Sequence, residues 1–194
     1  DGKSSIMAYK MMDLKTGEIE VLRQHEGEGS SSSPSIDGSH IAISEKVEIE
    51  GVRKTVITVQ DFEKINDIGS YVIPYSTVQN VLLKENKIYG YMWNEGNDEA
   101  FIGAVNMEND QFEIFKTPFG IHNYSTDGKH FAISVQKGES NTVQLFENYN
   151  GTLKRISKLP EIKERLVKPR FTEAGTLVVN GEGADRAMYL IRFK

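Results

Sequence analysis

The feature that most constrains the fold is a phrase of ten residues that the chain contains twice. SIDGSHIAIS occupies residues 35–44, and STDGKHFAIS occupies residues 125–134. Two weaker copies, KENKIYGY and TEAGTLVV, also place a polar turn before an apolar strand. The apolar residues that align across the four copies are Ile41, Ile88, Phe131 and Leu177, which are 47, 43 and 46 residues apart. Self-similarity at a period of about 40 to 50 residues is typical of repeat arrays.

A second repeated unit lies between these copies and has the pattern of a hairpin. Residues 8–22, 56–68, 101–115 and 143–157 each give a strand, a polar turn and another strand. Alternation of apolar and polar residues, as at Val143 and Leu145, indicates half-buried strands. Thr16-Gly17 and Asn150-Gly151 supply hairpin turn residues. Each period therefore holds about four short strands.

Prolines separate one set of strands from the next. They stand at Pro34, Pro74, Pro118 and Pro160. A missing amide is tolerated there because the chain is crossing between sheets. The one helical candidate is residues 161–168, EIKERLVK, which we expect to form a short turn in such a crossing.

The duplicated phrase resembles the repeat of TolB-like and WD-like β-propellers, which is usually written as Ser-Pro-Asp-Gly-Lys before an apolar strand. MMDLKTGE at residues 11–18 resembles the closing hairpin of that repeat. The chain departs from the repeat at Ile36 and Thr126, where the family usually has Pro. The resemblance implies four-stranded blades. Among relatives it implies periplasmic or extracellular scaffolding proteins, or the non-catalytic propeller of prolyl-oligopeptidase-type peptidases, and it implies no shared active site.

We therefore expect an all-β fold, a β-propeller of four-stranded antiparallel blades with about four to five blades present. The expected units are a partial blade at 1–24, blades at 34–73, 78–117 and 121–158, and a partial blade at 167–194. Either the first hairpin completes the last sheet of a single propeller domain, or the chain is a fragment of a larger ring. We favour the second reading because the chain begins within a blade, and exposed strand edges then call for a partner.

The charge balance excludes some partners. The chain has 23 basic and 28 acidic residues and a net charge of −5, which argues against nucleic acid or an anionic membrane surface as the main partner. No stretch approaches the roughly 20 apolar residues of a membrane-spanning helix, so we expect no direct membrane insertion by this segment. The chain has no Cys, which excludes disulfides and thiolate zinc sites.

The repeated Asp-Gly pairs are predicted to be scaffold. Asp37-Gly38 and Asp127-Gly128 combine a residue that tolerates positive φ with a side chain that closes an Asx-type turn, so we interpret them as hairpin turns. His40 and His130 follow the two turns at the same place. A duplicated position one blade apart predicts a structural role rather than a shared metal or catalytic site.

No catalytic motif occurs in the sequence. GEGSSSSPS at residues 27–35 lacks the strand-to-helix context of a serine nucleophile and is interpreted as a linker. Metalloprotease, calcium-loop and phosphate-loop patterns are also missing. We predict no catalytic residue, metal or cofactor in this chain, which favours a protein that is not itself an enzyme.

The topology of a propeller points to one surface. Loops between the second and third strands of each blade, expected at 45–54, 93–99, 136–141 and 181–186, share a face with the crossings at 69–77, 116–123 and 158–165. The aromatic and histidine candidates on this face are Trp93, Tyr71, Tyr75, Phe119 and His122. The acidic candidates are Glu95, Asp98, Glu182 and Asp185.

These residues predict a partly acidic face with aromatic anchors, which would bind a protein, a peptide or a cationic ligand. The simpler alternative is that the loops are charged for solubility and the aromatics pack between blades. The resulting hypothesis is a non-catalytic binding or scaffolding module outside the cytoplasm, periplasmic, cell-surface or secreted, from a lipoprotein or membrane-anchored parent. The rival hypothesis is the propeller domain of a prolyl-oligopeptidase-like peptidase or a glycan-acting enzyme, with catalysis elsewhere.

Overall fold

The computed structural model describes residues 6–26, 34–94, 96, 99–116, 123–137, 140–158, 165–172, 174–182 and 187–192. Seventeen strands lie within these ranges. The first ten are β1 (Ile6–Met12), β2 (Ile19–Glu26), β3 (Ser35–Asp37), β4 (His40–Ile49), β5 (Val52–Asp61), β6 (Asn66–Ile73), β7 (Thr77–Lys84), β8 (Lys87–Trp93), β9 (Ala100–Asn106) and β10 (Phe112–Phe115). The others are β11 (Asn123–Thr126), β12 (His130–Lys137), β13 (Ser140–Tyr149), β14 (Thr152–Lys158), β15 (Arg165–Phe171), β16 (Leu177–Glu182) and β17 (Met188–Ile191).

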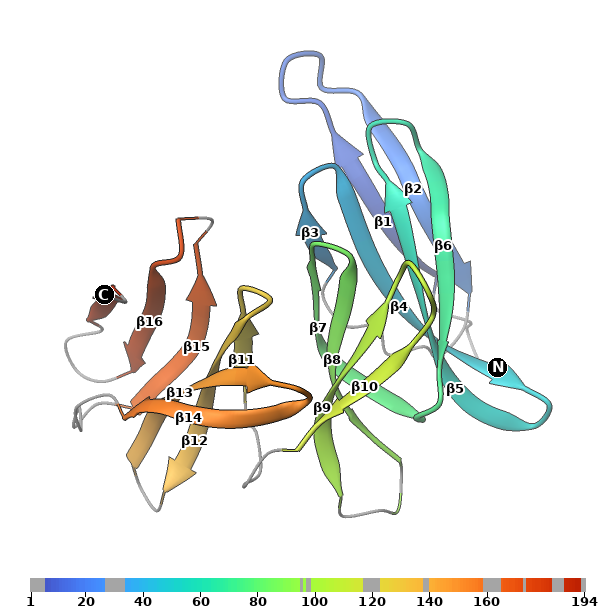
Figure 1. Ribbon diagram of the computed structural model, residues 1–194. Helices are drawn as coiled ribbons and strands as arrows, with labels where there is room; N and C mark the ends of the chain where they lie inside the picture. The colour runs from blue at the N-terminus through green and yellow to red at the C-terminus, as the bar shows by residue number, and fades with distance from the viewer. Residues whose placement is uncertain are drawn as a thin grey trace, which may run out of the picture.

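The strands form five antiparallel sheets in which neighbours in sequence are neighbours in space. The β1–β2 hairpin is followed by three four-stranded sheets, β3–β6, β7–β10 and β11–β14, and by the three-stranded sheet β15–β17. Figure 1 shows the sheets following one another around an arc, with the β1–β2 hairpin and the β15–β17 sheet at opposite ends. The expectation of an all-β fold made of four-stranded antiparallel sheets is confirmed.

The hydrophobic core lies between successive sheets rather than inside any one of them. Tyr89 from β8 and Phe115 from β10 meet Phe131 from β12, with ring centroids 5.1–6.1 Å apart. A second cluster lies between the β3–β6 and β7–β10 sheets, and a third lies between the β11–β14 and β15–β17 sheets. Burying one side chain of this size stabilises the fold by about 1.5 to 3 kcal/mol. The inter-sheet clusters therefore hold the arc together.

Central strands have both faces covered, which explains their composition. In β8, three consecutive residues, Ile88, Tyr89 and Gly90, are buried. Ile88 belongs to the cluster on one side of the sheet, and Tyr89 belongs to the cluster on the other side. A strand with two buried faces loses the simple alternation of apolar and polar residues. The period-2 signal is accordingly weaker here than at strands that face water.

Two sequence expectations about irregular segments were wrong. Residues 45–54 are not a loop, because β4 and β5 pair continuously from His40 to a tight turn at Glu50 and Gly51, both with positive φ. Residues 136–141 are mostly strand for the same reason, since Lys137 pairs with Ser140. The residues of both stretches extend their hairpins because they find cross-strand partners, and Val47, Ile49 and Val52 in the first stretch are β-branched residues that favour strands.

The prediction of a short helical turn at 161–168 was also wrong for the residues of it that the structure describes. Arg165, Leu166 and Val167 are in β15 and pair with residues of β16. Residues 161–164 lie outside the described part of the chain. Pro169 interrupts β15 at a shift in its pairing register, a position where a strand tolerates proline. The strand forms because β16 offers it an edge, which helix propensity alone does not reveal. Within the described ranges, no helix is long and apolar enough to span a bilayer.

Candidate functional site

A groove lies on the inner side of the arc. Its lining comes mainly from the first strand of each larger sheet, namely β3, β7, β11 and β15, which we call the inner strands. The groove has a volume of about 1460 Å³. Each inner strand is the edge of its sheet, so it turns its unpaired backbone edge toward the groove. This site was not singled out in the sequence.

Two serines of the duplicated phrase join neighbouring inner strands. Ser35 Oγ accepts a hydrogen bond of 2.8 Å from the backbone N–H of Leu83. Ser125 Oγ accepts one of 3.1 Å from the backbone N–H of Phe171. In both cases the donor belongs to the inner strand of the following sheet. The phrase is repeated because the same bond is needed at two junctions, and it protects an edge amide that would otherwise face the groove.

The two strands that donate to these serines carry the same irregularity. The pairing register shifts between Gln79 and Leu82 in β7, and between Val167 and Arg170 in β15. Asn80 and Lys168, at the shifts, both have φ of 51°. Bulges of this kind re-aim a side chain and are common beside binding sites. Each bulge lies three residues before the amide that the serine binds.

The bulge in β7 is fixed by a neighbouring sheet. The phenolic O–H of Tyr124, from β11, donates a hydrogen bond of 2.9 Å to the carbonyl oxygen of Asn80. Burial raises the pKa of Tyr124 well above its usual value, so the group stays a neutral donor. Tyr124 also belongs to the core cluster between the β7–β10 and β11–β14 sheets. One buried side chain therefore both packs the core and positions the strained residue.

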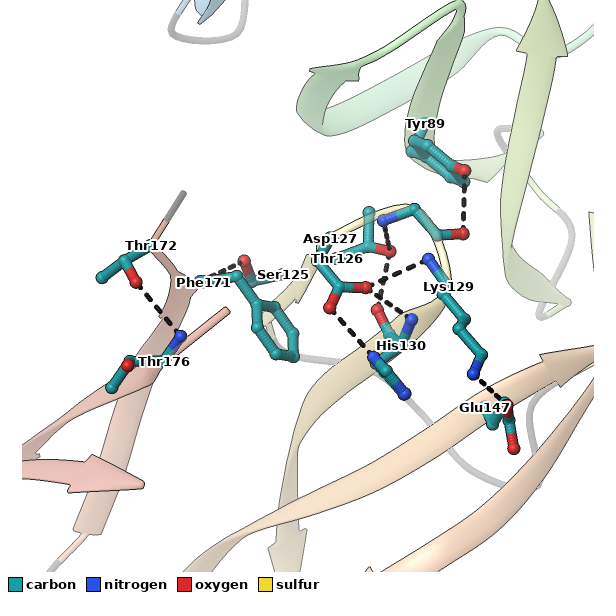
Figure 2. Close-up of polar contacts among 11 residues, drawn as sticks. Tyr89, Ser125, Thr126, Asp127, Lys129, His130, Glu147, Phe171, Thr172 and Thr176 are labelled. Atoms are coloured by element: carbon teal, nitrogen blue, oxygen red, sulfur yellow. Dashed lines mark hydrogen bonds and ion pairs between the residues drawn. The ribbon is translucent and has the colours of Figure 1, made fainter. Parts of the chain in front are cut away.

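The second Asp-Gly pair closes its own turn, as expected. Asp127 Oδ1 accepts hydrogen bonds from the backbone N–H groups of Lys129, at 3.0 Å, and His130, at 2.6 Å. Asp127 Oδ2 lies 2.9 Å from Nδ1 of the His130 ring, as Figure 2 shows. Gly128 supplies the positive φ that the turn requires. His130 at this turn is thus a structural partner of Asp127, in agreement with the scaffold interpretation.

The first pair behaves differently. Asp37 directs its carboxylate to the next sheet, where Oδ2 accepts from the backbone N–H of Glu85 at 2.7 Å and Oδ1 pairs with Lys84 Nζ at 3.1 Å. The equivalent turn after β15 has its own cap, because Thr172 Oγ1 accepts the N–H of Thr176 at 3.1 Å (Figure 2). Among the described residues, Asp127 is bonded within its own turn, whereas Asp37 is bonded to the next sheet.

Trp93 is the predicted aromatic that reaches the groove. It ends β8, pairs with Thr77 at the start of β7, and is half-buried at the groove lining. Its ring lies 5.4 Å from the ring of Tyr91, measured between centroids. Because Thr77 is the first residue of an inner strand, Trp93 lies at the end of the groove where the chain crosses from β6 to β7.

Two other predicted aromatics are half-buried between sheets. Tyr75 packs edge-on against Phe101, with centroids 4.7 Å apart, and lies 5.7 Å from Phe112. The O–H of Tyr71 donates to the carbonyl oxygen of Met107 at 3.4 Å. Burial raises the pKa of Tyr71. Both residues pack against the cluster between the β3–β6 and β7–β10 sheets, so part of each ring is engaged in packing.

The remaining predicted site residues cannot be placed beside Trp93. Glu95, Asp98, Phe119, His122 and Asp185 lie outside the described residues. Glu182 ends β16, and its side chain also falls outside the description. The acidic rim of the binding face therefore stays a prediction. Among the described residues, no three His, Cys, Asp or Glu side chains gather in a way that could hold a metal ion.

The chain resembles known proteins in its fold. No protein-family model and no curated protein sequence matches the chain. The β-propeller domain of the Trilobed protease from Pyrococcus furiosus, described as having an open velcro topology, superposes with a TM-score of 0.69 over 97% of this chain and 62% of that one, at 12% identity. TolB from Acinetobacter baumannii superposes with a TM-score of 0.62 over 94% of this chain and 45% of TolB, at 15% identity.

The chain has a TolB-like β-propeller fold. An oligogalacturonate lyase in complex with manganese shares it, with a TM-score of 0.60, 16% identity and coverage of 94% of this chain and 53% of the lyase. The chain thus spans between 45% and 62% of the lengths of these three propellers. At such identities the likeness concerns the fold alone. The sheets are propeller blades, and the groove is the inner, axial side of the blades.

The charges that line the propeller groove were missed by sequence reasoning. Among the described lining residues, four are cationic, Lys46, Lys84, Lys168 and Arg170, and three are anionic, Asp37, Glu85 and Asp127. The acidic residues end or follow inner strands, at the turns that lead into the second strand of each blade. The one sequence signal was KPR at residues 168–170, a proline between two cations inside what proved to be a strand.

Proposed function

We propose that this chain is a non-catalytic binding module that takes a protein or peptide partner on the face formed by the loops between second and third blade strands and the crossings between blades. The observation that carries the proposal is Trp93, a half-buried aromatic at the crossing-side end of a groove of about 1460 Å³. Partly exposed tryptophans beside a concave surface are typical anchors of binding interfaces.

The other predicted residues support the same face in different ways. Tyr75 follows β6 in a crossing between blades, and its ring packs against Phe101 and Phe112. A ring fixed in this way loses little conformational entropy when a partner covers its exposed part. The carboxylates of the rim, Glu95, Asp98, Glu182 and Asp185, would steer the basic parts of a partner.

The proposal can be tested without knowing the partner. Random peptides displayed on phage are selected on the immobilised chain, and the selected peptides are titrated against purified variants. We expect Trp93→Ala to weaken binding at least about tenfold, as loss of an aromatic anchor does. The matched control is Tyr149→Ala, which removes a different aromatic side chain. Tyr149 is 58% exposed, lies under Lys154 and is at the end of its blade opposite to the crossing side. Equal binding by both variants would contradict the proposal.

The second candidate function is the propeller of an enzyme whose catalytic residues lie in another segment. It is favoured by two of the structural neighbours, which are named as a protease and an oligogalacturonate lyase. The full open reading frame separates the two proposals. A segment with an α/β-hydrolase nucleophile, together with peptide hydrolysis that fails when that nucleophile is replaced, would favour the peptidase.

Two further parts of the proposal concern the whole protein. The first is that the chain is one propeller domain, or a fragment of a larger ring, with full blades at 34–73, 78–117 and 121–158 and partial blades at 1–24 and 167–194. The second is that the protein is located outside the cytoplasm, which the resemblance to TolB-like repeats implies. Fusion of the full open reading frame to alkaline phosphatase, which is active only after export, tests the location; an inactive, stable fusion would contradict it.

A further inference from the structure

The groove has a charge balance opposite to that of the chain as a whole. The chain has a net charge of −5, yet the described residues of the groove lining include four cationic and three anionic side chains. A concave surface with walls of low dielectric constant concentrates the potential of its charges. The groove therefore attracts anionic groups even though the molecule as a whole repels them.

The acidic side chains of the groove are largely neutralised by local partners. Asp37 is paired with Lys84 Nζ at 3.1 Å. Asp127 accepts two backbone N–H bonds and contacts the His130 ring. Because a carboxylate that is already hydrogen-bonded gains little from a new cation, these groups are poor sites for a basic ligand. Glu85 is the remaining carboxylate of the lining, and it is exposed.

Two cations of the groove have no such partner. Lys168 and Arg170 are exposed, and neither forms an ion pair with a described carboxylate. They flank Pro169, which is buried, and the bulge of β15 lies at the same point. Lys168 keeps a positive φ, a conformation that costs a non-glycine residue about 1 to 2 kcal/mol. A strained backbone that presents two neighbouring cations to a groove is an arrangement suited to a ligand.

Three backbone amides on or beside the inner strands β7 and β15 are already bonded within the fold and cannot pair with an added strand. The amides of Leu83 and Phe171 are taken by Ser35 and Ser125, and the amide of Glu85 is taken by Asp37. Strand addition depends on such backbone groups. Recognition at these positions therefore uses side chains. Among the described charged residues of the lining, Lys168, Arg170 and Glu85 have no ion pair, and two of these three are cations.

We propose that the groove binds an extended acidic peptide segment, with carboxylates on Lys168 and Arg170 and an apolar residue against Trp93. This inference rests on the proposed function and names the chemistry of its ligand. A volume of about 1460 Å³ exceeds the roughly 300 to 1,000 Å³ of sites for small molecules, which favours an extended segment. The planar guanidinium of Arg170 suits bidentate binding of a carboxylate.

An acidic oligosaccharide would bring the same carboxylates, but the groove suits a peptide better. Sugar rings in a row need a row of exposed rings to stack on. Of the aromatic residues of the described lining, Tyr124 is buried and Phe171 packs against the core, which leaves Trp93 as the anchor. A single anchor with nearby cations matches one apolar residue followed by acidic ones.

The test uses a fluorescein-labelled Gly/Ser peptide with Glu at alternate positions and one Trp, titrated by fluorescence anisotropy. The variant is Lys168→Gln with Arg170→Gln, in which glutamine removes the charge, stays polar and keeps a non-glycine residue at position 168. We expect affinity at low salt to fall about tenfold or more, because close charge pairs contribute at least that factor. The matched control is Lys15→Gln with Arg53→Gln, which removes two exposed cations that do not line the groove.

Three results would overturn the inference. The first is equal affinity of the acidic peptide for the wild type and the groove variant. The second is an equal loss in the control variant, which would indicate attraction to net charge alone. The third is binding of an oligogalacturonate with no binding of the peptide. If phage-selected peptides depend on Trp93 but not on Lys168 and Arg170, the proposed function stands and this inference fails; if they do not depend on Trp93, the proposed function fails.

Discussion

At the scale of single residues, Ser35 and Ser125 show the structural role of the duplicated phrase. Each hydroxyl binds an amide on the next inner strand, 48 and 46 residues further along the chain. The sequence predicts that the phrase is scaffold, because it is repeated. It does not predict the partner of the serine, because the distance between Ser125 and Phe171 is set by how two blades pack.

The bond of Ser125 predicts a measurable loss of stability. Replacing Ser125 by Ala leaves the Phe171 N–H without its acceptor in a nearly buried place, so we expect the free energy of unfolding to fall by about 1 to 3 kcal/mol. Urea denaturation followed by tryptophan fluorescence measures this. Thr152→Ala is the control, since Thr152 is exposed at the start of β14, and it should change stability by less than about 0.5 kcal/mol. A loss no larger for Ser125 than for Thr152 would show that the bond does not stabilise the fold.

Asp127 predicts a dependence of stability on pH. Burial alone would raise its pKa, but the hydrogen bonds from the side chain and backbone of His130 outweigh burial and hold the pKa below its usual value. A carboxyl with a lowered folded-state pKa stabilises the fold above its unfolded pKa of about 3.9, and this stability is lost as the pH falls through the lower folded-state value.

The variant Asp127→Asn should therefore be less stable than wild type at pH 6, by about 1 kcal/mol, and the difference should shrink as the pH approaches 3. Urea midpoints across this range give the comparison. Asp61 and Glu147 also have lowered pKa values, owing first to hydrogen bonds from Lys64 and Lys129, but they are present in both proteins and cancel. A difference that is constant with pH would rule out the ionic contribution.

At the scale of elements, hairpins with turn residues were predictable and register was not. Thr16-Gly17 and Asn150-Gly151 lie in turns because glycine adopts the positive φ that a tight turn needs. The strands at 45–54 and 165–168 were missed because their charged residues resemble a loop or helix when read alone. They extend because the partner strands β5 and β16 supply hydrogen bonds, which only the tertiary fold provides.

Some features of the candidate site were likewise predictable from the sequence and others were not. That Trp93 falls at the end of a second blade strand followed from the repeat. The repeat did not predict that Tyr71 and Tyr75 pack partly against the core, because the face on which an aromatic side chain lies depends on which sheet packs beside it. The bulge at Lys168 had no sequence signal of its own, since lysine seldom adopts positive φ; asparagine at position 80 tolerates it, but Asn also occurs at many other positions in this chain.

The bulge in β15 predicts an unusual order of stability among variants. Glycine adopts φ of 51° without strain, whereas alanine does not. We expect Lys168→Gly to be more stable than Lys168→Ala by about 1 kcal/mol, the reverse of the order in a regular strand. Guanidinium unfolding of the two variants gives the comparison. If the alanine variant is the more stable, residue 168 does not occupy the left-handed region in solution.

At the scale of the whole molecule, both ends of the arc present apolar blade faces to water. Met12, Ile19 and Val21 are at least half exposed on the β1–β2 hairpin, and Met188 and Leu190 are about two-thirds exposed on β17. Between blades, the corresponding faces are buried. This supports the proposal that the arc belongs to a larger ring.

The exposed ends predict how the isolated chain behaves. We expect the variant Met188→Lys with Leu190→Lys to bind less of the dye ANS and to sediment as fewer large species than the wild type, because it removes apolar surface that has no cover in the arc. Circular dichroism should be unchanged, since neither side chain is buried. Unchanged dye binding and sedimentation would indicate that this end is already covered.

The central claim is that consecutive antiparallel sheets pack face to face around a groove. The most direct measurement is the set of nuclear Overhauser effects in the isotopically labelled chain. The account predicts contacts between the ring protons of Tyr89 and Phe131 and of Phe115 and Phe131, which join two sheets. It also predicts that backbone contacts follow the strand pairs within each sheet, apart from the single bridge between Lys116 and Thr152. Backbone contacts between β4 and β13, or between any strands assigned to different four-stranded sheets, together with no contact among these three rings, would contradict it.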